Sequence, residues 1–95
     1  MFAINVVLKV KDSANIPQVR RLLMRCGELS RTEPGCLVYE ACHATNEPDT
    51  FMLIERWQSK EAWELHKTAE AYITIYHPQV IPLVDRTPFF CELLQ

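Results

Sequence analysis

The sequence predicts an α+β fold of the ferredoxin-like, split βαβ type, in which one four-stranded antiparallel sheet carries helices on one of its faces. The first observation is the order of the hydrophobic patterns. Runs that alternate with a period of two and runs with spacings of three and four follow one another as β-α-β-β-α-β. The second observation is size, because 95 residues with 48% hydrophobic side chains suffice for one domain, residues 1–95, with a single core.

The N-terminal part supplies a strand and the longer helix. Residues 2–10 alternate between two faces that are both mostly apolar, Phe2, Ile4, Val6, Leu8 and Val10 on one and Ala3, Asn5, Val7 and Lys9 on the other. A helix is expected from Asn15, a suitable N-cap, through the amphipathic stretch that ends near residue 32. Pro17 is tolerated in its first turn.

The rest of the chain supplies three strands and a broken helical region. Residues 36–44 and 50–57 are typical of strands, and the polar segment TNEPDT between them predicts a hairpin. In the first of these strands one side is expected to carry Leu37, Tyr39, Ala41 and His43. Ser59 is expected to cap a short helix, and a further helical stretch runs from about Glu70 to Tyr76. Pro78 lacks an N–H, so it is expected to start a new turn that runs to about Val84, before a last strand at 87–95.

The expected arrangement leaves one face of the sheet bare, although the first strand is apolar on both of its faces. An exposed apolar sheet of that size marks an interface. We therefore expect a homodimer in which two copies pack sheet to sheet.

Composition and missing motifs exclude several classes of function. A net charge of -2 and a pI near 5.9 argue against nucleic acid and anionic membranes as partners. No apolar run is long enough to span a bilayer, and the start MFAINVVLKVKD is not typical of an export signal. The four cysteines form no C-x-x-C pair, so we expect reduced thiols in a cytoplasmic protein and no metal site. Neither G-x-G-x-x-G nor a P-loop is present, so no flavin, nicotinamide or other cofactor is expected.

Two segments carry a resemblance to a known family. EPGCLVYE at 33–40 contains the pattern E-x-G-C-x-x-Y, and FMLIERWQSKEAWELHKT at 51–68 contains E-x-W followed by A-x-x-x-H. With these motifs the chain resembles the antibiotic biosynthesis monooxygenase family of small dimeric α/β-barrel proteins. The matching positions are Glu33, Gly35, Cys36, Tyr39, Glu55, Trp57, Ala62 and His66.

The resemblance implies one of three activities. Some members resemble cofactor-free oxygenases that act on polycyclic aromatics or quinols, others isomerise a small phosphorylated sugar-like signal, and others degrade haem. The haem-degrading branch has an Asn on the first strand, a Trp on the short helix and a His on the following one. This chain has Asn5 and His77 but carries His66 at the position of the Trp, so haem degradation ranks below the other two.

His66 and Asn5 are the candidate catalytic residues. His66 lies on the apolar stripe of the short helix, where it is either a buried neutral histidine with one hydrogen bond or a general base for a phenolic hydroxyl. Asn5 is a neutral amide within a hydrophobic strand and needs a partner. That partner is either a group of the protein or an oxygen of the substrate or of dioxygen.

Five further residues are candidates for substrate binding: Trp57, Tyr39, Tyr72, His77 and Glu55. Trp57 and Tyr39 lie on strands that face the interior, where Trp57 is either core or the wall of a pocket. Tyr72 and His77 lie around the expected break in the helix and either pack there or form a lid. Glu55 shares a face with apolar residues, so it is expected to form an ion pair with a Lys or Arg of another element or of the dimer partner.

The leading hypothesis is a cofactor-independent monooxygenase for an electron-rich aromatic molecule or a quinol. In this scheme Trp57 and Tyr72 hold the ring while His66 removes a phenolic proton. Asn5 orients a substrate oxygen, and the resulting anion passes an electron to dioxygen. Two alternatives stay open, an isomerase of a small oxygenated metabolite that uses His66 for proton transfer, and a non-catalytic dimer that binds a small ligand.

Overall fold

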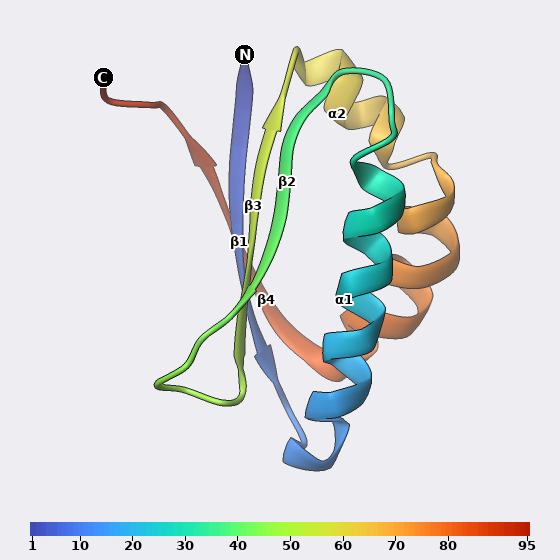
Figure 1. Ribbon diagram of the computed structural model, residues 1–95, viewed down its shortest axis with the longest axis vertical. Helices are drawn as coiled ribbons and strands as arrows, with labels where there is room; N and C mark the ends of the chain where they lie inside the picture. The colour runs from blue at the N-terminus through green and yellow to red at the C-terminus, as the bar shows by residue number, and fades with distance from the viewer.

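Four strands form one antiparallel sheet in the order β2-β3-β1-β4 in the computed structural model, which describes all residues 1–95 (Figure 1). The strands are β1 (Phe2–Val10), β2 (Cys36–His43), β3 (Thr50–Trp57) and β4 (Val84–Cys91). The 3₁₀ turn η1 (Ser13–Asn15) and the helix α1 (Ile16–Ser30) follow β1. Between β3 and β4 lie the helix α2 (Lys60–His66), the π-helix η2 (Ala71–Val80) and the 3₁₀ turn η3 (Ile81–Leu83). The predicted ferredoxin-like α+β fold is confirmed.

The helices lie on one face of the sheet, to the right in Figure 1, and the opposite face is uncovered. The core between the two layers is formed by alternate residues of the central strands and by the apolar stripe of α1: Ile4, Val6, Leu8, Phe51, Leu53, Val19, Leu23 and Cys26. Each large apolar side chain that is fully buried in this way contributes about 1.5–3 kcal/mol. The register places Ile4 opposite Glu55 of β3 and Phe90 of β4.

Side-chain caps fix where the helices begin. Ser59 Oγ accepts a hydrogen bond of 3.1 Å from the N–H of Ala62, which confirms the predicted cap of α2. At α1 the prediction was wrong in detail, because Asn15 makes no capping bond. Asp12 instead accepts a bond of 3.0 Å from the N–H of Ala14. The chain therefore enters α1 through the turn η1.

The segment after α2 departs from the predicted break at Pro78. Residues Ala71–Val80 form one continuous π-helix with Pro78 inside it. The i→i+5 hydrogen bonds of a π-helix make wider turns than those of an α-helix. Pro78 has no N–H, so it leaves one of these bonds unmade without ending the helix. Such segments are frequent at functional sites. The last strand also differs from the prediction, since β4 begins at Val84 and ends at Cys91.

The edge strand β2 contains an irregularity that the alternation did not predict. Its register with β3 shifts between Cys36 and Val38. The shift turns Leu37 outward, to 55% exposure, rather than to the side of Tyr39. Arg31 donates a hydrogen bond of 2.9 Å to the backbone oxygen of Tyr39 and so occupies part of this edge.

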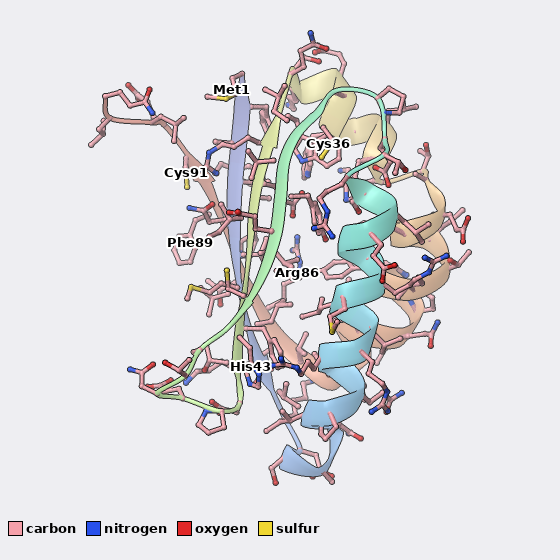
Figure 2. The ribbon with its side chains drawn as sticks, in the orientation of Figure 1. Met1, Cys36, His43, Arg86, Phe89 and Cys91 are labelled. Carbon is pink, nitrogen blue, oxygen red and sulfur yellow. The ribbon has the colours of Figure 1, made fainter.

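The uncovered face of the sheet combines an apolar area around Asn5 with polar side chains, among them Glu40, Lys9 and Asp85. Asn5 lies opposite Ile54 of β3 and Phe89 of β4, so these three side chains share that face. Phe89 is half exposed and points away from the helices in Figure 2. Arg56 donates a hydrogen bond of 3.2 Å to Asn5 Oδ1. Met52, which is also exposed, extends the apolar area.

Candidate active site

Glu33 and His66 are brought together by the loop after α1 and by α2. The loop turns at Gly35, whose φ of +79° lies in the left-handed region that favours glycine. The backbone oxygen of Gly35 accepts a hydrogen bond of 2.8 Å from the N–H of Gln58, which ties the loop to the end of β3. A Cβ at position 35 would lie 2.6 Å from the Cβ of Ala62, so the loop approaches α2 this closely only because residue 35 is glycine.

The Glu33–His66 pair is the centre of the site. Glu33 Oε1 lies 2.6 Å from His66 Nδ1, and the two side chains are 11% and 6% exposed. An ionised carboxylate only accepts hydrogen bonds, so Nδ1 carries the hydrogen. Nε2 is left as the basic nitrogen, and no group of the protein donates a hydrogen bond to it. The pair therefore holds the imidazole in one tautomer with a nitrogen free for proton transfer.

Three aromatic rings surround the imidazole. The ring centroids lie 4.6 Å from His66 for Trp57, 5.8 Å for Tyr39 and 5.9 Å for Tyr72. Trp57 and Tyr39 are buried and belong to the sheet, whereas Tyr72 belongs to η2 and is half-buried. The imidazole is thus held between the sheet and η2 in surroundings with little water.

Glu55 is a second acid at the site, and its side chain is buried. Its Oε1 accepts a hydrogen bond of 2.9 Å from Trp57 Nε1. Burial raises the pKa of Glu55, and the hydrogen bond from Trp57 opposes this rise. The predicted ion pair is not formed within the chain, because Trp57 shares this face of β3 and supplies a neutral donor.

Two buried phenols complete the polar surroundings. Burial raises the pKa of Tyr39, and the nearby Glu55 raises it further. Burial also raises the pKa of Tyr76 to about 12, although Arg86 opposes the rise. Arg86 Nε donates a hydrogen bond of 2.8 Å to the hydroxyl oxygen of Tyr76. Both phenols are therefore neutral hydrogen-bond donors at physiological pH.

These groups enclose a small polar cavity of about 20 Å³. Its lining is Tyr39, Leu53, Glu55, Trp63, His66, Lys67, Tyr72, Tyr76 and Arg86. A space of this size holds about one water molecule. A larger molecule can enter only when the cover formed by α2 and η2 moves.

A wider, open groove of about 400 Å³ lies elsewhere, between α1 and the β2–β3 hairpin. His43 lines it (Figure 2), but both nitrogens of this histidine are engaged. Nδ1 lies 2.9 Å from Arg20 Nη1, Nε2 lies 2.7 Å from the backbone oxygen of Pro48, and the ring stacks on Phe51. His43 has no free nitrogen for proton transfer, so we place the candidate chemistry at His66.

Four of the seven predicted site residues line the cavity: His66, Tyr39, Tyr72 and Glu55. Trp57 lies outside the lining, because it is fully buried behind His66. Its indole acts on the site through Glu55 and through contact with the imidazole.

Asn5 and His77 lie outside the cavity. The prediction that Asn5 and His66 face one hollow was wrong, because the alternation of β1 turns Asn5 to the uncovered face of the sheet. Its amide is bonded to Arg56 there. His77 is exposed on η2, with its ring 5.9 Å from that of Tyr72.

Sequence reasoning did not assign a site role to Glu33, Trp63, Lys67 or Arg86. Glu33 belongs to the E-x-G-C-x-x-Y motif, which is the signal that could have identified it. Trp63 precedes His66 on the same short helix, and Lys67 follows His66 as the C-cap of that helix. Arg86 has no sequence signal, since only the fold of β4 brings it beneath η2 (Figure 2).

Comparison with known families assigns the chain. A family model described as antibiotic biosynthesis monooxygenase matches residues 1–77. The chain belongs to the antibiotic biosynthesis monooxygenase family. The match includes both motifs and the Glu33–His66 pair. No curated protein matches the sequence at a significant level.

Solved structures support the fold of this antibiotic biosynthesis monooxygenase family member. A crystal structure described as an antibiotic biosynthesis monooxygenase is 22% identical, with a TM-score of 0.85 over 98% of this chain and 99% of that one. A conserved protein of unknown function from Bacteroides thetaiotaomicron is also 22% identical, with a TM-score of 0.88 over 97% and 96%. A protein from Pseudomonas aeruginosa is 20% identical, with a TM-score of 0.87 over 99% and 95%. At these identities the likeness concerns the fold alone.

In this family member no helix is both long and apolar enough to cross a bilayer. No group of three or more His, Cys, Asp or Glu side chains is arranged to hold a metal ion.

Proposed function

We propose that this family member is a cofactor-independent monooxygenase that acts on a small electron-rich aromatic molecule, such as a quinol or an anthrone-like phenol. The observation that carries the proposal is the Glu33–His66 pair at the edge of the cavity, where the bond of 2.6 Å leaves His66 Nε2 free. Family membership supports the coarser statement that the chain is a small-molecule monooxygenase or a small-molecule-binding protein.

His66 acts as the general base in this proposal. Nε2 takes the hydroxyl proton of the substrate, and the carboxylate of Glu33 stabilises the imidazolium that forms. The phenols of Tyr39 and Tyr76 line the same cavity and are neutral donors. Such donors stabilise the negative charge that develops on the substrate oxygen.

The deprotonated substrate supplies the electrons. With an anthrone-type substrate a ring methylene becomes a carbonyl. One atom of dioxygen enters that carbonyl, and the other leaves as water with the two methylene hydrogens, so the substrate gives up four electrons and no other reductant is needed. The protein contributes positioning and the exclusion of water.

Entry of a ring requires the cover of the cavity to move. The cover is formed by Trp63 of α2, by Lys67 at the C-cap of this helix and by Tyr72 of η2. Because His66 also belongs to α2, the opening is made by these three side chains while the backbone of the helix stays in place. In the revised scheme Tyr72 and Trp63 contact the ring, whereas Trp57 remains behind the base.

The proposal is tested by oxygen uptake with a panel of quinols and anthrone-like phenols. His66→Ala removes the base and is expected to lower the rate by roughly a hundredfold or more. His43→Ala is the matched control, because His43 lies in the other groove and has no free nitrogen. Uptake by His66→Ala as fast as that of the parent, or no uptake with any member of the panel, contradicts the proposal.

An isomerase is the second candidate, because the cavity brings a buried acid, Glu55, to the same space as His66. Two proton-transfer groups around one substrate are what a proton-shifting reaction requires. This candidate predicts turnover of a small oxygenated metabolite under anaerobic conditions. Tight binding without turnover under either condition supports the third alternative, a ligand-binding protein.

We also propose that two copies pair through the uncovered face of the sheet. Phe89 and Met52 are exposed on this face, and the Arg56–Asn5 bond adds a polar contact at its centre. The segment after β4 projects away from the helices in Figure 1 and carries Leu94, which is 90% exposed. A second copy on this face would cover these side chains.

A further inference from the structure

Trp63 separates the cavity from a second, larger space. Trp63 lines the small cavity of about 20 Å³ beside His66. It also lines an open groove of about 350 Å³, which we call the outer groove and whose lining is Phe2, Lys60, Trp63, Glu64 and Phe90. One side chain is therefore the shared wall of two spaces.

The outer groove lies beside α2, on the same face of the sheet as the helices. Phe90 belongs to the edge strand β4, and it is 64% exposed although it lies opposite the buried Ile4. With Phe2 and Trp63, Phe90 forms a contiguous aromatic patch, and such patches mark sites where a ligand or partner binds.

The rings of the outer groove are arranged to accept another flat ring. Phe2 stacks against Trp63 with centroids 5.0 Å apart and planes at 27°. Phe90 meets Trp63 edge to face, at 5.6 Å and 84°, and lies 5.8 Å from Phe2. Offset-stacked and edge-to-face contacts are the arrangements that aromatic rings prefer. The volume is within the range of sites for small molecules.

One cation without an acidic partner borders the wall between the two spaces. Lys67 Nζ lies 4.1 Å from the ring centroid of Trp63, and Lys67 forms no ion pair in the structure. Lys60 and Glu64 at the rim of the outer groove carry opposite charges, so Lys67 supplies the unpaired positive charge beside Trp63. Arg86 lies further inside the cavity, where it bonds to the hydroxyl of Tyr76 and its charge opposes the rise in the pKa of Glu55.

We propose that the outer groove is the entry site for a planar aromatic ring with an anionic substituent, and that Lys67 receives this substituent. The ring docks against Phe2, Trp63 and Phe90, and displacement of the Trp63 indole then opens the way to His66. The inference rests on the proposed function for its second step, because it assumes that the ring is the substrate. The docking step stands on the groove itself.

Binding is measured by NMR with the full chain, using the two indole N–H signals of its two tryptophans. The probes are 2-naphthoate and the neutral 2-naphthalenemethanol. We expect 2-naphthoate to shift the signal of Trp63 more than that of the buried Trp57, and to bind more tightly than the neutral probe. No shift of the Trp63 signal at millimolar probe, or equal affinity for both probes, overturns the inference.

Variants locate the two parts of the site. Phe90→Ala removes one wall and is expected to weaken binding of both probes by about tenfold. Lys67→Gln is expected to remove most of the preference for the anionic probe, a change of about fivefold for a partly exposed charge. Leu65→Ala is the control, because Leu65 is a comparably exposed residue of α2 that lines neither space. Unchanged binding in both Phe90→Ala and Lys67→Gln overturns the inference.

The same titration with His66→Ala separates this inference from the proposed function. His66 does not line the outer groove, so 2-naphthoate is expected to bind this variant as it binds the parent. If 2-naphthoate shifts the Trp63 signal but the parent chain takes up no oxygen with any substrate of the panel, the outer groove is supported and the proposed monooxygenase function is contradicted. If neither Phe90→Ala nor Lys67→Gln changes kcat or KM for oxygen uptake, the outer groove is not the entry site.

Discussion

Glu33 Oε1 lies 2.6 Å from His66 Nδ1, and this contact joins two segments that are 33 residues apart in the sequence. Glu33 comes from the loop after α1, and His66 is the last residue of α2. The contact therefore couples the position of a short helix over the sheet to the orientation of one ring. Because Gly35 and Ala62 touch beside it, the pair is held in place before any ligand binds.

Removal of the Glu33 charge tests whether this pair serves catalysis. Glu33→Gln keeps the size and an acceptor for Nδ1 but removes the charge that stabilises the imidazolium. We expect kcat for oxygen uptake to fall about a hundredfold with little change in KM. Glu61→Gln, an exposed change in the first turn of α2, is the control. The downfield ring N–H proton of His66 should also be lost from the NMR spectrum of Glu33→Gln. If kcat of this variant equals that of the parent, the Glu33–His66 contact is structural and does not serve catalysis.

Gly35→Ala tests how the loop is held against α2. The change forces a left-handed φ on alanine and drives its Cβ to 2.6 Å from that of Ala62. We expect the free energy of unfolding, measured in urea, to fall by about 2 kcal/mol. The double variant Gly35→Ala, Ala62→Gly removes the clash but not the strain, so it should recover part of the loss. No loss in the single variant would mean that the loop relaxes freely.

Much of the fold was predictable because its signals are local. Ser59 caps α2 as a serine before a helix should, and the polar hairpin segment pairs β2 with β3. The predicted break at Pro78 was wrong because the effect of a proline depends on the type of helix that contains it. The spacing of apolar residues does not distinguish a π-helix from an α-helix here. The bulge that exposes Leu37 is likewise a property of the pairing of two strands.

The candidate site was predictable only in part because it is assembled from segments distant in the sequence. His66 stood out by its place on an apolar stripe, but the carboxylate that orients it follows α1, and Arg86 arrives from the last strand. Asn5 was assigned to the wrong side even though the period of two already separated it from Ile4. The polarity of Asn5 within a hydrophobic strand identified it as unusual, but only the alternation of side chains along the strand shows which face of the sheet it lies on.

Glu55→Gln tests the pH dependence of stability. Burial raises the pKa of Glu55 above its ordinary value of 4.5, so the folded chain binds this proton more tightly than the unfolded chain. The contribution of Glu55 to stability is thus fully present below pH 4.5 and is lost as the pH rises through the raised pKa. Gln keeps the acceptor for Trp57 Nε1 and has no charge to bury.

We therefore expect Glu55→Gln to be more stable than the parent at pH 8, by about 1 kcal/mol, and the difference to shrink towards pH 4.5. Urea unfolding at both pH values measures the difference directly. A Gln variant that is less stable than the parent at pH 8 would show that the ionised carboxylate is net stabilising.

Phe89→Asp tests the proposed pairing of two copies. Phe89 is 51% exposed on the uncovered face, where it belongs to the edge strand β4 and lies opposite Asn5 of β1. In a symmetric dimer the change replaces two apolar side chains of the interface by two carboxylates, and burying a charge costs several kcal/mol. The dissociation constant should therefore rise by a hundredfold or more, since about 1.4 kcal/mol corresponds to tenfold. Sedimentation at micromolar concentration measures the shift from dimer to monomer.

Leu65→Asp is the matched control for this variant. Leu65 is 57% exposed, but it belongs to α2 on the opposite side of the sheet, so its charge stays in water whether or not the sheets pair. We expect the parent and Leu65→Asp to sediment as dimers and Phe89→Asp as a monomer with an unchanged circular dichroism spectrum. A parent that is monomeric at tens of micromolar, or a Phe89→Asp variant that remains dimeric, would mean that the uncovered face is not where two copies meet.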